Sequence, residues 1–211
     1  LNLAIDFAVR LDGPPVAAYA GDPIKAHRAA VNFGDRMIWG AELGGLADAA
    51  IASPGTQPTI GNKTQPTDIP FKSRAIDFVA AGVKHGGTII FLAGRGRLPV
   101  PDDPFELDLF SLPVERLAQL AERRTWPHDS RTVLTRLRAI ANAWWARRAF
   151  HTRSVYLVGS ELTNDDLLRL GAHRADTIDE AIPAMLRAHG DTARIALVPD
   201  AATTLCLPDL H

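Results

Sequence analysis

The strongest candidate for chemistry in this sequence is a cluster of cations where a polar loop meets a helix. Residues 54–70 are rich in Pro, Gly, Thr, Asn and Gln, and the run Phe71-Lys72-Ser73-Arg74 follows them. Because a helix is predicted from about Ser73, Lys72 and Arg74 should lie at its positive end, beside backbone amides without a partner in the helix. This combination is typical of an anion site, and it suits a carboxylate as well as a phosphate. A helix start that is simply solvated is the alternative.

A second candidate is the glycine-rich run Gly94-Arg95-Gly96-Arg97, which follows an apolar stretch at 88–93. Its amides, together with the guanidiniums of Arg95 and Arg97, can hold an anion. The run lacks the third glycine of a dinucleotide-binding fingerprint, so an ordinary turn is the favoured interpretation.

The sequence offers no pattern for a metal site or an activated nucleophile within this chain. Its 7 His residues include no pair at the short helical spacing of metal ligands. A single cysteine, Cys206, excludes an internal disulfide and a cysteine-based zinc site, and its apolar surroundings predict an inert thiol. We therefore predict neither a catalytic nor a metal-ligating residue here.

Composition narrows the classes of protein that this chain can represent. It has 211 residues, 46% of them hydrophobic, with 23 Lys+Arg against 24 Asp+Glu. This near balance leaves no field for a polyanion, so no nucleic-acid partner is expected. The apolar runs are much shorter than the roughly 20 residues of a membrane span, and no signal peptide is visible. We therefore expect no membrane partner and a cytoplasmic location. Because the chain starts at Leu1, we interpret it as part of a longer protein.

Apolar runs separated by turn residues predict strands and helices that alternate along most of the chain. This pattern predicts an α/β fold: a layered domain with a mixed, largely parallel sheet flanked by helices, which opens with an N-terminal β-hairpin over residues 3–20. Residues 99–113 are irregular and acidic. We interpret them as an excursion within a single domain that spans 1–211.

Capping residues predict where helices begin and end. Asp22 with Pro23 should start a helix over 24–38, and Thr163 should start a short helix that Gly171 closes.

Three further helices have predicted bounds. Thr177 should open one of them with a capping box, and the cationic run with two glycines at 84–87 should end the helix predicted over 73–83. A helix over 131–150 should turn Leu137 and its neighbours to the core and leave its many arginines on a solvated face.

Several short runs occur in an order that matches a known arrangement. They are Ala-Gly-Asp-Pro-Ile-Lys-Ala-His-Arg at 20–28, Ala-Asp-Ala-Ala-Ile-Ala-Ser-Pro-Gly-Thr-Gln-Pro at 47–58, Ala-Ile-Asp at 75–77, Ala-Gly-Val-Lys-His-Gly-Gly-Thr-Ile-Ile at 81–90, Thr-Ile-Asp-Glu-Ala-Ile at 177–182 and Ala-Leu-Val-Pro-Asp at 196–200. In this order they resemble the C-terminal domain of the lactate racemase-like family, which comprises racemases and epimerases that depend on a nickel-pincer nucleotide. The resemblance is collinear over nearly the whole chain.

The resemblance implies a two-domain isomerase that moves a hydride from the α-carbon of a 2-hydroxy acid to the cofactor and back. It implies that a preceding N-terminal domain holds the nickel-pincer nucleotide and the acid/base histidines. This chain would then be the substrate-capping domain, partnered by its own N-terminal domain and by a small carboxylate substrate. Alone it would be catalytically inactive.

The resemblance also implies which residues contact substrate. The family's Tyr-Gln-x-x-Lys motif falls on Pro70, Phe71 and Arg74, so only the cation is kept, with Lys72 as possible help. Trp145 is the nearest match to the tryptophan that lines the family's site, with Trp144 or Trp126 as its alternative. Because Phe71 and Arg74 depart from the motif, two other functions stay open: a non-catalytic α/β module that binds a small anion or a partner, or a degenerate, inactive member of the family.

Overall fold

The computed structural model describes residues 3–9, 14–37, 40–54, 69–93, 109, 111–122, 130–160, 162–201 and 204–208. The strands are β1 (Ala4–Val9), β2 (Pro15–Gly21), β3 (Gly40–Glu42), β4 (Ala47–Ala52), β5 (Val83–Leu92), β6 (Ser154–Val158), β7 (Ala172–Ala175), β8 (Ile195–Val198) and β9 (Leu205–Leu207). The helices are α1 (Pro23–Met37), α2 (Ile69–Ala80), α4 (Val114–Ala121), α5 (Ser130–Thr152), α6 (Asn164–Leu170) and α7 (Ile178–His189).

A five-stranded sheet forms the centre of the molecule, in the order β7-β6-β5-β4-β8. Each neighbouring pair in this sheet is parallel. Two smaller pairs complete the strands: the antiparallel hairpin of β1 and β2, and the parallel pair of β3 and β9. The predicted α/β class, with a largely parallel sheet and an N-terminal β-hairpin, is therefore confirmed.

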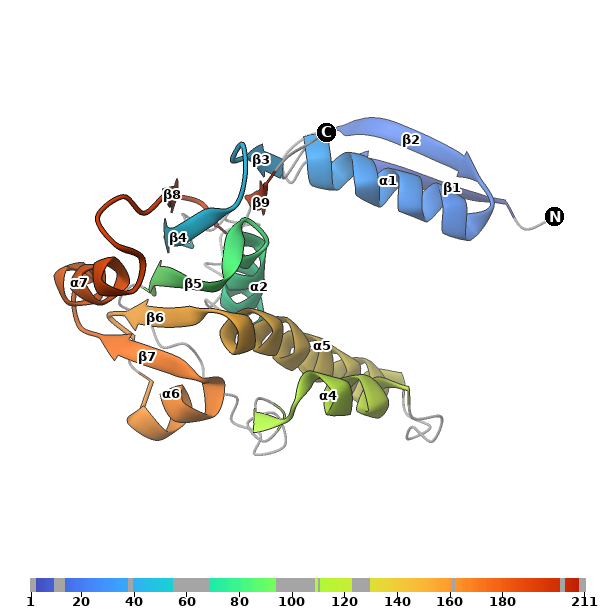
Figure 1. Cartoon of the computed structure of the whole chain (residues 1–211). Helices are drawn as coiled ribbons and strands as arrows, with labels where there is room; N and C mark the ends of the chain where they lie inside the picture. The colour runs from blue at the N-terminus through green and yellow to red at the C-terminus, as the bar shows by residue number, and fades with distance from the viewer. Residues whose placement is uncertain are drawn as a thin grey trace.

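The central sheet is buried on both faces, which gives the molecule two apolar cores. On one face Ile89 and Phe91 pack with residues of α2 and α5, and α4 packs against α5. On the other face Ile90 packs with Met185 of α7. Figure 1 shows α7 and the pair of α2 and α5 on opposite sides of the sheet. Burial on both faces explains why the central strand β5 contains an unbroken apolar run rather than an alternating one.

The hairpin and α1 form a separate layer beside this sheet, next to β3 and β9 (Figure 1). Helix α1 covers one face of the hairpin, where the rings of Tyr19 and Phe33 lie 6.3 Å apart and His27 Nδ1 lies 2.7 Å from the Asp6 carboxylate. The opposite face of the hairpin has no layer over it among the described residues. Its side chains include Leu3 and Phe7, which are 63% and 52% exposed.

The boundary between α2 and β5 differs from the prediction. The helix ends at Ala80, and the strand already begins at Val83, so residues 84–87 are strand rather than helix end. The glycines there form a bulge instead of a cap: Gly86 has a φ of +77°, and the pairing with β4 jumps from Val83 to Thr88. Val83 is buried as the helical spacing indicated, but it belongs to the strand.

The predicted caps are confirmed at two helices and wrong at a third. The Asp22 carboxylate accepts hydrogen bonds of 3.1 Å from the amides of residues 24 and 25. Thr163 forms a full capping box, and Gly171 closes that helix at a φ of +74°. The Thr177 side chain makes no cap bond. Instead, the Glu180 carboxylate accepts a hydrogen bond of 2.7 Å from the amide of Asp176, one residue before the expected partner.

The excursion predicted at 99–113 lies mostly outside the described residues. Its described part includes Leu109, which is buried in the core beside α2 and α5. Of the helices in the described ranges, none has both the length and the apolar character that a bilayer crossing requires.

Candidate functional site

The first half of α2 lies toward the carboxyl edge of the central sheet. The helix connects two parallel strands, and only two residues separate its last residue, Ala80, from the start of β5 at the amino edge. A helix of 12 residues is about 18 Å long, so its first turns lie toward the opposite edge. That is the edge where open α/β sheets bind their ligands.

Three of the predicted substrate-binding residues belong to this part of α2. The helix starts at Ile69, earlier than predicted, so Phe71 and Lys72 are in its first turn and Arg74 is in its second. The predicted helix start at about Ser73 is therefore too late, because the helix extends through Pro70, a residue type that is favoured in a first turn. The side chains of Phe71, Lys72 and Arg74 are outside the described part of the structure.

Trp145 belongs to the neighbouring helix α5, and its side chain is also outside the described part. The two helices pack together, and Arg148 Nε lies 3.8 Å from the Asp77 carboxylate across them. Arg74 is three positions before Asp77 on α2, and Trp145 is three positions before Arg148 on α5. The two residues therefore occupy corresponding positions on adjacent helices. The other weak candidates, Arg95 and Arg97, lie outside the described residues.

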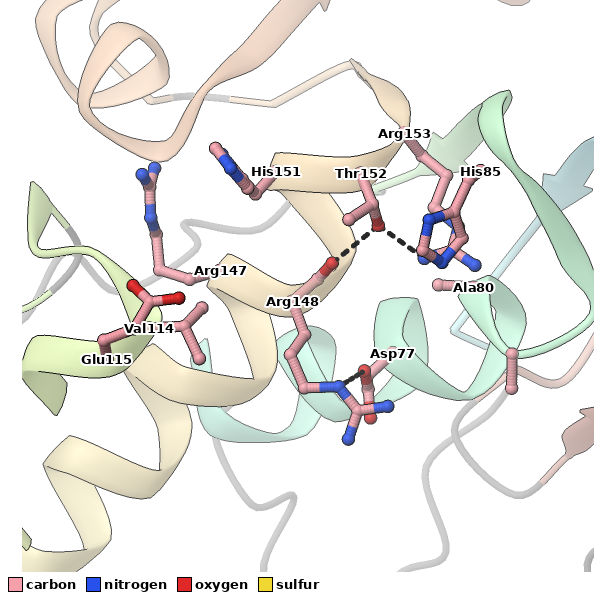
Figure 2. Close-up of a pocket in the computed structure, with 11 residues that line it drawn as sticks. Asp77, Ala80, His85, Val114, Glu115, Arg147, Arg148, His151, Thr152 and Arg153 are labelled. Carbon is pink, nitrogen blue, oxygen red and sulfur yellow. Dashed lines mark hydrogen bonds and ion pairs between the residues drawn. The ribbon is translucent and has the colours of Figure 1, made fainter. Parts of the chain in front are cut away.

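A cavity of about 520 Å³ lies at the other, amino edge of the sheet. The ends of α2 and α5, the start of α4 and the start of β5 surround it, as Figure 2 shows. Its lining residues are Asp77, Ala80, Ala81, His85, Val114, Glu115, Arg147, Arg148, His151, Thr152 and Arg153.

The ion pair of Asp77 on α2 with Arg148 on α5 lines part of this cavity. Burial raises the pKa of the Asp77 carboxyl, and the nearby guanidiniums of Arg148 and Arg153 act in the opposite direction. Arg148 also lies over the ring of Trp144, at 4.7 Å from the ring centroid. The aromatic contact and the ion pair together hold the Arg148 side chain along the surface of α5.

Arg153 joins the end of α5 to the start of β5. One of its terminal nitrogens donates a hydrogen bond of 2.8 Å to the backbone carbonyl of Val83. Another donates to the hydroxyl of Thr152, which itself donates to the carbonyl of Arg148 at 2.8 Å. Burial lowers the pKa of the Arg153 guanidinium, while Asp77 opposes this shift.

Sequence reasoning missed this cavity because it assigned the arginines of α5 to a solvated face. Arg148 fits that expectation, since about half of its side chain is exposed. Arg147 and Arg153 do not: the Nε atom of each is buried and has no hydrogen-bond partner within the described ranges. The signal in the sequence was the concentration of Arg147, Arg148, His151 and Arg153 at the junction of a helix and a strand.

The remaining candidates for chemistry have structural roles. Burial raises the pKa of the Cys206 thiol to about 11, which confirms the prediction of an inert cysteine. His189 Nε2 lies 2.9 Å from the hydroxyl of Thr88, and the ring of His173 stacks on Tyr156 at 4.8 Å. In the part of the chain that the structure describes, no three His, Cys, Asp or Glu side chains gather as a metal site requires.

The central parallel sheet has helices on both faces, and α2 begins toward its carboxyl edge, so the chain is a parallel α/β domain. No family model and no curated protein matches the sequence. Among solved structures, the chain is similar to the lactate racemase apoprotein from Thermoanaerobacterium thermosaccharolyticum, with a TM-score of 0.62 and 18% sequence identity. The match covers 98% of this chain and 46% of that one, so this chain spans about half the length of the racemase. The chain therefore has a lactate racemase-like fold.

Proposed function

We propose that this chain is the substrate-capping, C-terminal domain of a lactate racemase-like racemase or epimerase that acts on a 2-hydroxy acid or a related polyol acid. The observation that carries this proposal is the extent of the structural match. Almost all of this chain, but less than half of the racemase apoprotein, takes part in it. A second domain is therefore part of the proposal.

The proposed substrate contacts come from the start of α2. Arg74 neutralises the substrate carboxylate, because a guanidinium can bind both carboxylate oxygens at once. Lys72 adds a second cation, and Phe71 presents an apolar surface where the family has an amide. Trp145 on α5 lines the same site. Together these residues orient the substrate and exclude water when the domain closes.

The cofactor belongs to the other domain in this proposal. A nickel-pincer nucleotide would supply the hydride transfer. The described residues of this chain do not gather the ligands that a nickel ion needs, so we assign the cofactor and the acid/base groups to the partner domain. This chain alone should then be inactive.

The uncovered face of the hairpin is the surface that we propose for this partner domain. Ile5 and Phe7 of β1 and Leu3, which directly precedes the strand, lie at alternate positions and are 60%, 52% and 63% exposed. Their cross-strand neighbours Ala18 and Ala20 are exposed and apolar as well. A contiguous exposed apolar face of this kind is typical of a surface that binds another protein or domain. The part of the racemase with no counterpart here is long enough to cover this face.

The test is to replace Arg74 by Gln in the complete two-domain enzyme and to measure racemisation of 2-hydroxy acids. Loss of a charge-assisted contact of roughly 1.5–3 kcal/mol should reduce kcat/KM by about tenfold to a hundredfold. Arg187→Gln removes the same charge from an exposed position on α7 and should leave kcat/KM unchanged. Equal kcat/KM values for Arg74→Gln and the parent enzyme would exclude Arg74 as the substrate clamp.

The alternative of a degenerate, inactive member is motivated by Phe71, where the family has an amide. The double variant Phe71→Gln with Arg74→Lys restores the glutamine and the lysine of the family's motif. Activity that appears only in the double variant would favour a degenerate member. An active parent enzyme would exclude it.

A further inference from the structure

The cavity at the amino edge of the sheet has more cationic than acidic side chains. Three guanidiniums, from Arg147, Arg148 and Arg153, line it together with two carboxylates, from Asp77 and Glu115. One of the carboxylates, Asp77, is already 3.8 Å from Arg148. Asp77 also acts on the Arg153 guanidinium, and Glu115 lies on the same side as Arg147 in Figure 2, so the set as a whole keeps an excess of one positive charge.

Arg147 and Arg153 each also lack one of the hydrogen bonds that usually accompany a desolvated guanidinium. In each of them Nε is buried and has no hydrogen-bond partner among the described residues. A charge that water screens poorly attracts an anion more strongly than an exposed one. The hydrogen bonds of Arg153 to Val83 and Thr152 fix its guanidinium in advance, which lowers the entropy cost of binding.

The two arginines lie at opposite ends of the cavity. They are six positions apart around the end of α5, which corresponds to about 9 Å along a helix axis. In the view of Figure 2, Arg147 and His151 are on one side, Arg153 and His85 are on the other, and the Asp77–Arg148 pair lies between them. Each end thus combines a guanidinium with an imidazole, the Arg147 end also has the Glu115 carboxylate, and the acidic Asp77 separates the ends.

This arrangement defines the chemistry of the ligand. A single phosphate or monocarboxylate can reach only one of the two ends. A molecule with a carboxylate at each end can contact both while its middle passes the Asp77–Arg148 pair. The volume of about 520 Å³ is in the range of small-molecule sites.

We propose that this cavity binds a small dicarboxylate, with one carboxylate near Arg147 and the other near Arg153. The site is at the amino edge, whereas α2 begins toward the carboxyl edge. The proposal therefore does not depend on the proposed racemase function, and it applies to this chain on its own.

Isothermal titration calorimetry of the chain 1–211 with glutarate, acetate and inorganic phosphate tests the proposal. Glutarate should bind saturably and at least about tenfold more tightly than acetate or phosphate. Arg147→Gln should weaken glutarate binding about tenfold and bring it near the acetate value. Arg187→Gln, which removes a charge from exposed α7, should not change it.

Three results would overturn the proposal: no saturable binding of glutarate, equal affinities for glutarate and acetate, or equal weakening by Arg147→Gln and Arg187→Gln. A readout without a variant protects against misfolding of Arg147→Gln. In the parent chain, glutarate should shift the imidazole NMR signals of His85 and His151. Shifts confined to other histidines would also contradict a site in this cavity.

Discussion

The glycine pair at the start of β5 shows how single residues determine the path of the chain. Gly86 takes a left-handed conformation, and a side chain there would meet no atom within 4 Å. Gly87 is different, because the chain folds tightly around it. A Cβ on Gly87 would lie 2.5 Å from Cγ1 of Val83 and 2.7 Å from the carbonyl oxygen of Asp48. The bulge thus depends on both glycines, for different physical reasons.

Gly87→Ala should therefore destabilise the chain more than Gly86→Ala. The backbone oxygen of Asp48 cannot move away without disturbing β4, so overpacking at Gly87 should cost about 3 kcal/mol. The left-handed conformation at Gly86 should cost an alanine about 1 kcal/mol. Urea unfolding followed by circular dichroism measures both. A smaller loss at Gly87 than at Gly86 would show that the bulge can open without cost.

At the scale of elements, the sequence predicts what depends on local patterns. The run at Thr88–Leu92 identifies the central strand, and Asp22 and Thr163 identify helix starts by their capping chemistry. The strands β3, β7 and β9 have only 3, 4 and 3 residues, too few for a periodic signal, and they went unrecognised. The glycines at 86–87 were interpreted as a helix end because a bulge and a cap both favour glycine.

The candidate sites were less predictable than the fold. The cationic start of α2 is visible in the sequence because Lys72 and Arg74 are close in the chain. The amino-edge cavity is visible only in part: its arginines are close in the chain, but Asp77 and Glu115 come from two other elements. Only the packing of α2 and α4 on α5 turns those separate charges into one site.

The contact between α2 and α5 should make stability depend on pH. Burial raises the pKa of Asp77 in the folded chain above its value of 3.8 in the unfolded chain. The folded state therefore binds the proton more tightly, so Asp77 should lower the free energy of unfolding as pH rises from about 4 through the raised pKa. Denaturation of the parent chain and of Asp77→Asn at pH 4 to 7 measures this effect. Relative to Asp77→Asn, the parent should lose stability as pH rises.

Asp48 provides a control, because its contribution to stability should change with pH in the opposite direction to that of Asp77. The hydrogen bond from Lys84, 2.6 Å long, lowers the pKa of Asp48, and the amide of Arg194 acts in the same direction. Relative to Asp48→Asn, the parent chain should therefore gain stability as pH rises through the lowered pKa and up to about 4. Slopes of the same sign at Asp77 and Asp48 would show that the burial of Asp77 does not control its protonation.

At the scale of the whole molecule, the layers around the hairpin are incomplete. The central sheet has helices on both faces, but the hairpin has α1 on one face only among the described residues. Leu168 on α6 is 80% exposed, and Ile195 and Leu197 on β8 are 37% and 74% exposed, a smaller and less exposed set than Leu3, Ile5 and Phe7. The hairpin face is therefore the surface of this chain that we expect a partner domain to cover.

This expectation can be tested with the partner domain of the proposed two-domain enzyme. The double variant Ile5→Ser with Phe7→Ser changes two residues that are already 60% and 52% exposed, so the stability of the isolated chain should change by no more than about 0.5 kcal/mol. Binding to the separately expressed partner domain should fall at least about tenfold, because each replacement removes an apolar contact. Leu168→Ser is the matched control, and it should bind like the parent.

Racemisation should appear only when the two parts are mixed. Activity in the isolated chain, or binding that the double variant leaves intact, would mean that this chain does not work as the cap of a second domain through its hairpin.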